Sequence, residues 1–405
     1  MNDVSPSTVI LKPAASDQSF DFDVTIVGAG PVGLALAGWL ARRSATAPLK
    51  IALIDAREPE DSIADPRAIA VSHGSRMILE PLRWPADATA IERIHVSQRG
   101  HFGRTLIDHK EHDLPALGYV LRYGSIVHGL AEAVHATSVH WFRSTSAAAP
   151  VQDHDGVTLP IDTAGVTRTL RTRILVNAEG GLFGDQGKTG ERDSRDYGQT
   201  ALVGTVTVSA PRPHVAWERF TSQGPIALLP MGGVRGANYA LVWCCAPDEA
   251  ARRAQLPDEA LLAELGAAFG DRMGRFTGIN GRASFPLGLN AVDTLVKGRV
   301  VAIGNAAQTL HPVAGQGLNL GLRDAHALVD ALSTEGPTPL ALASFAQRRA
   351  LDRRLTIGAT DTLARLFTID FPPLALVRGL ALTALEFLPP VKTALARQMM
   401  FGQRR

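Results

Sequence analysis

The sequence predicts an α/β fold, in which a Rossmann-like nucleotide-binding domain is joined to a β-sheet domain and to helices at the C-terminal end. Three observations predict it. A β-branched run near the start leads into a glycine-rich turn and a helix. A second glycine-rich segment follows another such run far along the chain, and the stretch between them is rich in Val, Thr and Trp. At 405 residues the chain also exceeds what one hydrophobic core usually serves, so two joined domains are expected.

The first glycine-rich turn has the full spacing of a dinucleotide-binding βαβ unit. An apolar run at 23–27 precedes the turn, a helix is expected after it, and a second apolar strand at 50–54 ends at an acidic residue. The site residues of this unit are Gly28, Gly30, Pro31, Gly33 and Asp55. The first glycine permits the tight turn, the second lets the backbone approach a pyrophosphate, and the third lets helix and strand pack closely. Asp55 is expected to accept hydrogen bonds from a ribose, in NAD or in FAD.

A second glycine-rich segment bears on the choice between these nucleotides. Residues 298–303 read as a buried strand, and Gly304 and Asn305 follow it directly. Gly315 and Gly317 then open an expected helix, whose free amides form a positive end. Such an end stabilises the electron-rich edge of a reduced flavin, which favours FAD. The alternative is a glycine-rich loop that only turns a corner.

The same segment carries a resemblance to a known family. Gly-Asn-Ala-Ala-Gln-Thr-Leu-His-Pro, followed by Ala-Gly-Gln-Gly, resembles the second motif of the aromatic-hydroxylase flavin monooxygenases, which share the p-hydroxybenzoate hydroxylase fold. Asn305 and Gln308 stand where most of that family has Asp and His. This version is similar to the 2-polyprenyl-6-methoxyphenol hydroxylase branch of the ubiquinone-biosynthesis hydroxylases. Further segments with this likeness lie at 94–101, 117–120, 284–287 and 387–390.

The resemblance implies FAD-binding roles for residues of the second segment. Asn305 is expected to meet the ribityl or pyrophosphate region, and Pro312 to lie near the reactive C4a edge of the flavin. His311 lies beside Pro312, either near the chemistry or in a structural role. The backbone contacts to the flavin pyrimidine fall on Gly317, Leu318 and Asn319.

Two further positions follow from the resemblance. Arg67, which ends the sequence Asp65-Pro66-Arg67, is expected to reach the FAD, although a surface ion pair is the alternative. Glu179 stands where the family has the Asp of an Ala-Asp-Gly motif that serves FAD and the nicotinamide donor. Because Glu is one methylene longer than Asp, the sequence does not decide whether Glu179 contacts the nicotinamide donor.

The activity implied is hydroxylation of a polyprenylated methoxyphenol through a flavin C4a-hydroperoxide, with FAD as cofactor, NAD(P)H or another reductant as transient donor, and O₂. Three alternatives stay open: hydroxylation at another position in the ubiquinone pathway, a different flavin reaction such as dehydrogenation or halogenation, and a flavin-free prenyl-binding chaperone of related fold. The sequence indicates no catalytic base.

The domain organisation expected is discontinuous. Residues 1–20 read as a flexible tail. The FAD-binding domain is expected at 21–85, 121–187 and 298–334, the substrate domain at 86–120 and 188–297, and a C-terminal helical region at 335–405.

Several partners and sites are not expected. A net charge of +2 is too small to indicate binding of nucleic acid. His109 and His112 lack further Cys or acidic ligands at the spacing of a metal site. Cys244 and Cys245 suggest core positions and a reducing cytoplasm. An apolar stretch at 374–388 is too short to span a bilayer. It is either a helix on the core or a surface for the inner membrane or another ubiquinone-pathway protein.

Overall fold

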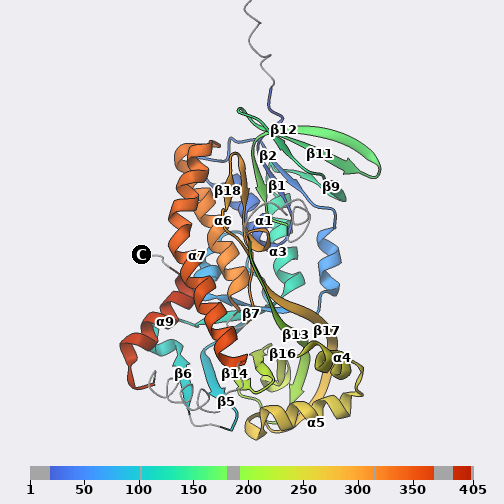
Figure 1. The fold of residues 1–405 in the computed structure, drawn as a ribbon, viewed down its shortest axis with the longest axis vertical. Coiled ribbons are helices and arrows are strands. Elements are labelled where there is room, and N and C mark those ends of the chain that lie inside the picture. The colour runs from blue at the N-terminus through green and yellow to red at the C-terminus, as the bar shows by residue number, and fades with distance from the viewer. Residues whose placement is uncertain (1–18, 101–102, 180–191, 313–314, 369–385, 403–405) are drawn as a thin grey trace, which may run out of the picture.

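The computed structural model describes residues 19–100, 103–179, 192–312, 315–368 and 386–402. Figure 1 shows one β-sheet layer near each end of the long axis of the molecule. Two long helices, α6 (Gln316–Glu335) and α7 (Pro339–Thr368), run side by side next to the upper layer. The expected tail at 1–20 lies almost wholly outside the described residues, as does most of the apolar stretch at 374–388.

The centre of the upper layer is a parallel sheet. Its strands are, in order, β8 (His140–Phe142), β2 (Ile51–Ile54), β1 (Phe22–Val27), β12 (Val166–Asn177) and β19 (Val300–Ala302). Both faces are covered, which explains why these strands are nearly continuous apolar runs. The chain segments that follow β1, β2, β12 and β19 therefore meet at one edge, where ligands bind in sheets of this kind.

Antiparallel strands extend this sheet, and helices cover it. The added strands are β9 (Thr145–Ala147), β10 (Val151–Gln152), β11 (Val157–Thr163) and β18 (Val296–Lys297). The helix α1 (Pro31–Arg42) packs against both α6 and α3 (Tyr123–His135), and apolar side chains of all three join those of the central strands in one core cluster.

The lower layer is an eight-stranded mixed sheet. Its strands are, in order, β20 (Gln308–Thr309), β17 (Phe276–Val292), β13 (Arg192–Val208), β16 (Asn238–Cys245), β15 (Gly224–Pro230), β14 (Val215–Thr221), β5 (Arg93–Gln98) and β6 (Arg104–Asp108). Among the described strands of this sheet, β14 and β5 pair in parallel and the other neighbours pair antiparallel. The helices α4 (Pro247–Gln255) and α5 (Asp258–Phe269) accompany this sheet, and α5 contributes to a second core cluster on one of its faces. Cys244 and Cys245 are buried, unbonded thiols in β16.

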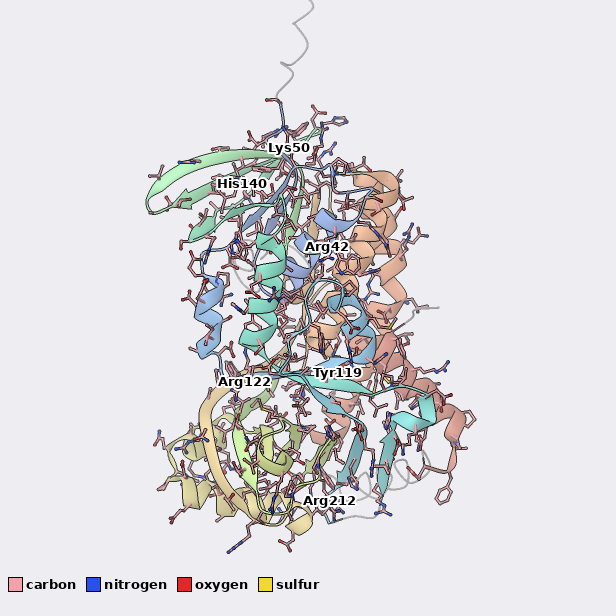
Figure 2. All side chains as sticks on the ribbon, turned by 180° about the vertical axis from the view of Figure 1, so that it is seen from behind. Arg42, Lys50, Tyr119, Arg122, His140 and Arg212 are labelled. Atoms are coloured by element: carbon pink, nitrogen blue, oxygen red, sulfur yellow. The ribbon has the colours of Figure 1, made fainter. Side chains whose placement is uncertain are left out.

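A small antiparallel sheet lies between the two layers. It consists of β3 (Ala68–Ser72), β7 (Gly118–Arg122) and β4 (Thr89–Ile91). Figure 2 shows Tyr119 and Arg122, both on β7, at the junction of the layers. The remaining helical elements are α2 (His73–Leu79), α9 (Pro389–Phe401), η1 (Pro59–Ala64), η2 (His109–His112), η3 (Val234–Gly236), η4 (Asp271–Met273) and η5 (Gly304–Ala306).

A buried ionic network fixes α6 against α7. Arg349 Nε donates to Asp324 Oδ1 at 2.7 Å, and Arg349 Nη1 lies 2.7 Å from Asp352 Oδ2. Arg323 Nε completes the network with a 3.0 Å hydrogen bond to Asp352 Oδ2. All four side chains are at most 8% exposed. The network matters for the site because α6 carries the second glycine-rich segment at its N-terminus.

Candidate active site

A cavity of about 820 Å³ lies between the two layers. Its walls come from both glycine-rich segments and from the lower sheet, so segments far apart in sequence enclose one space. Most of the site residues expected from the sequence line it: Gly28, Gly30, Pro31, Asp55, Arg67, Glu179, Asn305, His311, Pro312, Gly315, Gly317 and Leu318. Gly33, Gly304 and Asn319 do not line it.

The glycines of the first turn have different local surroundings. Gly28 has a φ of +109°, and a Cβ there would lie 2.8 Å from the backbone carbon of Ala178. A Cβ on Gly33 would lie 1.9 Å from the carbonyl oxygen of Gly28, so only glycine lets α1 start this close to the strand. At Gly30 the nearest atom is Tyr123 Oη, 3.6 Å away. A side chain at Gly30 would therefore enter the cavity without meeting protein backbone.

Asp55 connects the end of β2 to this turn. Its side chain is buried, and Oδ2 accepts a 2.6 Å hydrogen bond from the amide of Ala29. Oδ1 accepts a second bond from the amide of Arg57 at 2.8 Å. The carboxylate thus holds the backbone of the turn in addition to facing the cavity.

Glu179 brings a second carboxylate to the same end of the cavity. Its Oε2 is inaccessible to solvent and has no hydrogen-bond partner among the described residues. Burial, reinforced by the charge of Asp55, raises the pKa of Glu179 to about 7. An inaccessible acceptor of this kind is suited to a donor group from a bound molecule.

The second glycine-rich segment presents an open helix end. Gly315 adopts a φ of +59° directly before α6 begins at Gln316. A Cβ on Gly317 would have nothing within 4 Å, so the first turn of α6 borders free space. Asn305 is exposed towards the cavity.

The two expected site residues of this segment that do not line the cavity, Gly304 and Asn319, are engaged in packing. Gly304 has a φ of +60°, and a Cβ there would touch the side chain of Val32 at 3.2 Å. The side chain of Asn319 joins β3 to α6, because its amide accepts from Ser72 N at 2.8 Å and donates to Ala70 O at 3.0 Å. Asn319 thereby supports the cavity wall from behind.

His311 is almost completely buried beside Pro312 at the cavity wall. Its Nε2 lies 3.1 Å from Gln199 Oε1, and the ring of Tyr197 packs edge-on at 5.2 Å. Burial lowers the pKa of His311 to about 4, so the imidazole is neutral at physiological pH.

Comparison with known proteins identifies the family. The FAD binding domain family matches residues 21–337. Ubiquinone hydroxylase UbiL of Rhodospirillum rubrum is 33% identical, with 93% of this chain and 89% of that protein covered. The 3-demethoxyubiquinol 3-hydroxylase of Escherichia coli is 29% identical, with 90% and 94% covered. The crystal structure of p-nitrophenol 4-monooxygenase PnpA from Pseudomonas putida shares the fold, with a TM-score of 0.74 at 16% identity over 95% of this chain and 99% of that one.

The chain belongs to the FAD-dependent monooxygenase family. The expected p-hydroxybenzoate hydroxylase-like fold and the resemblance to the ubiquinone-pathway hydroxylases are thus confirmed.

In this monooxygenase, Arg67 is held in one orientation. Its Nε and Nη2 donate to both carboxylate oxygens of Asp65 at 2.6–3.1 Å, which raises the pKa of Arg67. The guanidinium also lies over the ring of Tyr123, 4.5 Å from its centroid, and 5.6 Å from that of Phe285 in β17. The arginine therefore forms an ion pair, the alternative expected from the sequence, and also lines the cavity. Sequence reasoning missed Tyr123, because the strand-to-helix junction at Tyr123-Gly124 does not have the glycine spacing of a recognised nucleotide-binding turn.

Sequence reasoning named none of the residues of the apolar wall of the cavity as site residues. One face of the lower sheet contributes Ile94, Ala216, Ala227, Leu229 and Val242, all apolar. These residues belong to β5, β14, β15 and β16, and only the pairing register places them side by side. Glu218, two residues after Ala216 on β14, brings a carboxylate to the same wall.

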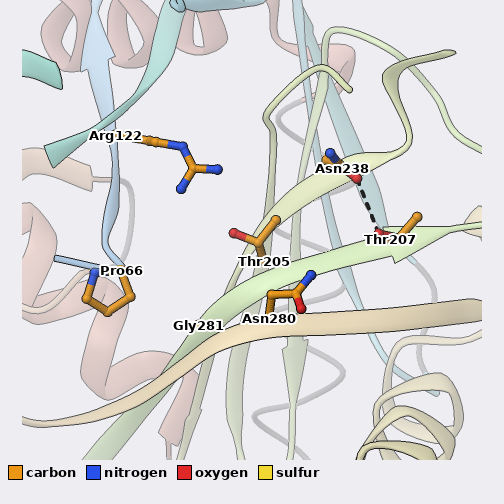
Figure 3. Close-up of a pocket in the computed structure, with 7 residues that line it drawn as sticks. All are labelled: Pro66, Arg122, Thr205, Thr207, Asn238, Asn280 and Gly281. Atoms are coloured by element: carbon orange, nitrogen blue, oxygen red, sulfur yellow. Dashed lines mark hydrogen bonds between the residues drawn. The ribbon is translucent and has the colours of Figure 1, made fainter. Parts of the chain in front are cut away.

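A smaller polar pocket of about 190 Å³ lies at the junction of the layers (Figure 3). Arg122 extends into it from one side, and Thr205, Thr207, Asn238 and Asn280 face it from the lower sheet. Thr207 donates to Asn238 Oδ1 at 3.2 Å across its floor. Pro66 lines this pocket, and its neighbour in sequence, Arg67, lines the main cavity.

Proposed function

We propose that this chain hydroxylates the aromatic ring of a polyprenylated phenol in ubiquinone biosynthesis, with FAD as its cofactor. The observation that carries the proposal is the cavity of about 820 Å³, in which a nucleotide-binding edge faces an apolar wall. FAD-dependent hydroxylation is the activity of this family, and the named relatives act in the ubiquinone pathway.

The residues present fit FAD. Space is open above Gly30 and Gly317, the two positions where a dinucleotide and a flavin would need close backbone approach. Gly30 would hold the pyrophosphate, Asp55 and Glu179 the ribose, and Asn305 the ribityl chain. The start of α6 at Gly317 and Leu318 would hold the flavin pyrimidine. When bound, FAD supplies the electron transfer and oxygen activation that no side chain provides.

The chain itself supplies orientation and exclusion of water. The apolar wall around Ala216, Leu229 and Val242 desolvates an aromatic ring and leaves it few orientations. Neutral His311, held by Gln199, keeps the wall beside Pro312 uncharged. Holding the ring close to the reacting centre converts an encounter in solution into a reaction within one complex.

The division of labour that we propose follows the expected domain limits. FAD binding falls to 21–85, 121–187 and 298–334, and substrate binding to 86–120 and 188–297. Two alternatives remain distinguishable: hydroxylation at another ring position, and a flavin-free prenyl-binding chaperone. The open spaces at both glycine segments favour a flavoprotein over the chaperone.

We further propose that the chain acts at the surface of the inner membrane on its cytoplasmic side, because a polyprenyl tail is almost insoluble in water. No helix among the described residues is long and apolar enough to cross a bilayer. Four large apolar side chains at the start of α9 are 39–77% exposed: Phe387, Leu388, Val391 and Leu395. Such a face can enter a lipid interface or contact another pathway protein.

The same helix is also part of the core, because Ala396 and Met400 are buried against Leu117. The membrane contact is therefore tested by Phe387→Ser with Leu388→Ser rather than by truncation. We expect activity on a short-chain soluble phenol to persist, and activity on a long-chain phenol in vesicles to fall. Equal activity of the double variant on both substrates would refute the membrane contact while leaving the hydroxylase assignment intact.

The hydroxylase assignment is tested with a panel of prenylated phenols and the FAD-loaded protein. We expect one hydroxyl group to be added to the ring of at least one phenol, at a position that mass spectrometry and NMR identify. Colourless protein that cannot be reconstituted with FAD would instead support the alternative of a flavin-free prenyl-binding chaperone.

A further inference from the structure

The face of the lower sheet that points away from the cavity carries a group of arginines. The register pairs Ser97 of β5 with Arg104 of β6 on one side and with Arg219 of β14 on the other. Directly opposed residues in a sheet project to the same face, so these three side chains form one row across three strands. Arg272 of η4 reaches the same point, since its Nη1 donates to Ser97 Oγ at 3.1 Å.

Two donors of Arg219 in this row are not satisfied. Nε and Nη1 of Arg219 are inaccessible to solvent and have no hydrogen-bond partner among the described residues. In the neighbouring row, His95 and Trp217 are paired, and the centroids of their tilted rings lie 4.6 Å apart. His95 Nδ1 and Trp217 Nε1 are likewise inaccessible and without a partner in the described part of the chain. Inaccessible polar groups are rarely left unpaired, so this concentration indicates a missing acceptor.

The missing acceptor is anionic. No carboxylate among the described residues forms an ion pair with Arg219, Arg272, Arg104 or Arg99, although other arginines of this sheet are paired, as Arg93 is with Asp108. Burial and the charges of Arg272 and Arg99 lower the pKa of Arg219. The pKa of His95 is lowered to about 4, by burial first and then by Arg272, Arg104 and Arg219. These shifts show that the cationic groups are close enough to repel one another.

We propose that this face holds a binding site for a phosphate group, centred on Ser97 and formed by Arg219, Arg272 and Arg104. Arg104 and Arg219 flank Ser97 from strands roughly 10 Å apart, twice the spacing of neighbouring strands, and this gap suits one tetrahedral oxyanion between them. Guanidinium groups bind phosphate through paired hydrogen bonds, and a doubly charged anion neutralises several cations at once. The site is distinct from the cavity wall formed by Ala216 and Glu218, because these residues alternate with Arg219 along β14 and project to the other face of the sheet.

The phosphate could be carried by a phospholipid headgroup or by a soluble phosphate compound. Both present the same chemistry to the arginines. The experiment below distinguishes the two sources and tests the site independently of hydroxylation.

The test measures the Tm of the FAD-loaded protein in a titration with inorganic phosphate, against chloride at the same ionic strength. FAD occupies the nucleotide cavity, so phosphate has no access there. We expect phosphate to raise the Tm by on the order of a few degrees beyond chloride, because a ligand that binds only the folded state stabilises it. Arg219→Met and Arg272→Gln should remove this rise. The control is Arg212→Met, an exposed arginine at the same end of the molecule (Figure 2), which should keep it.

The Tm in the absence of phosphate is a second readout, in which the substitution is expected not to destabilise the protein. Without phosphate, Arg219→Met should melt no lower than the unmodified protein, because it removes a partly buried charge that lacks a counter-ion. If Arg219→Met fails to fold, the phosphate-dependent rise in Tm is measured in Arg272→Gln, which replaces an exposed side chain. An equal response to phosphate and chloride, or a phosphate response that survives in both variants, would overturn the proposal.

Vesicles identify the source of the phosphate. Cosedimentation with phosphatidylglycerol vesicles, weaker with phosphatidylcholine and lost in Arg219→Met, assigns the site to a lipid headgroup. Phosphate-dependent stabilisation without vesicle binding assigns it to a soluble phosphate compound.

Discussion

The amide of Ala29 donates a 2.6 Å hydrogen bond to Oδ2 of Asp55, so the acid at the end of β2 holds the glycine-rich turn after β1. This bond gives Asp55 a structural task in addition to the ribose contact expected from the sequence. Asp55→Ala should therefore weaken FAD binding and also destabilise the apoprotein by about 1–3 kcal/mol, because the buried Ala29 amide loses its acceptor. FAD titration by fluorescence quenching and urea unfolding of the apoprotein measure the two effects. Asp55→Asn, which keeps one acceptor oxygen, should cost less in both, and an unchanged FAD dissociation constant in Asp55→Ala would show that this carboxylate does not contact the cofactor.

Gly30→Val should prevent FAD binding without preventing folding. A side chain there enters the cavity rather than the protein core, since its nearest neighbour is Tyr123 Oη. The flavin content of purified protein and its circular dichroism measure the two outcomes. The control is Gly358→Ala, because Gly358 is exposed in α7 and a Cβ there has nothing within 4 Å. Full flavin occupancy in Gly30→Val would place the pyrophosphate elsewhere.

Glu179 should make the stability of the apoprotein depend on pH. Its pKa rises from 4.5 to about 7 on folding, so the folded state favours the protonated form. The resulting penalty is absent below about pH 4.5, grows as the pH rises and is complete above about pH 7. Glu179→Gln removes this penalty, so its Tm relative to the unmodified apoprotein should increase across that window and then level off. A difference in Tm that does not vary with pH would contradict the raised pKa.

Asp352→Asn should be strongly destabilising. It leaves Arg323 and Arg349 buried without their shared carboxylate, and breaking a buried ionic pair in this way costs about 3–5 kcal/mol. Urea unfolding of the FAD-loaded protein measures the loss. Asp330→Asn is the control, because its ion pair with Arg43 is partly exposed and should contribute less than about 1 kcal/mol. Similar losses in the two variants would mean that the network does not hold α6 in place.

The sequence predicted the parts of the site that are encoded locally. The turn from Gly28 to Gly33 and the first turn of α6 around Gly317 could be recognised because glycine spacing can be read from residues that are close in sequence. The apolar wall could not be recognised in this way. Alternation along β14 separates Ala216 from Arg219, but only pairing with β5 and β15 decides which face borders the cavity.

Other side chains form hydrogen bonds to residues that are distant in the sequence. The expectation for Asn319 concerned only its backbone, whereas its side-chain amide bonds to Ser72 and Ala70, which lie almost 250 residues earlier in the chain. Gln308 departs from the family motif, and its position is explained by bonds to Asp324 and Arg353 behind the cavity. The partners of Asn319 and of Gln308 could not be inferred from the residues that are close to them in sequence.

The central claim is that FAD and an aromatic ring meet in the cavity between the two layers and that oxygen is transferred to the ring. It is tested most directly by reducing the FAD-loaded protein without oxygen and then admitting isotopically labelled O₂ with a short-chain prenylated phenol. The account predicts a ring-hydroxylated product that carries one labelled oxygen atom, formed by the unmodified protein and not by flavin-free Gly30→Val. Reoxidation of the flavin with an unchanged phenol, or a hydroxylated product without the label, would contradict it.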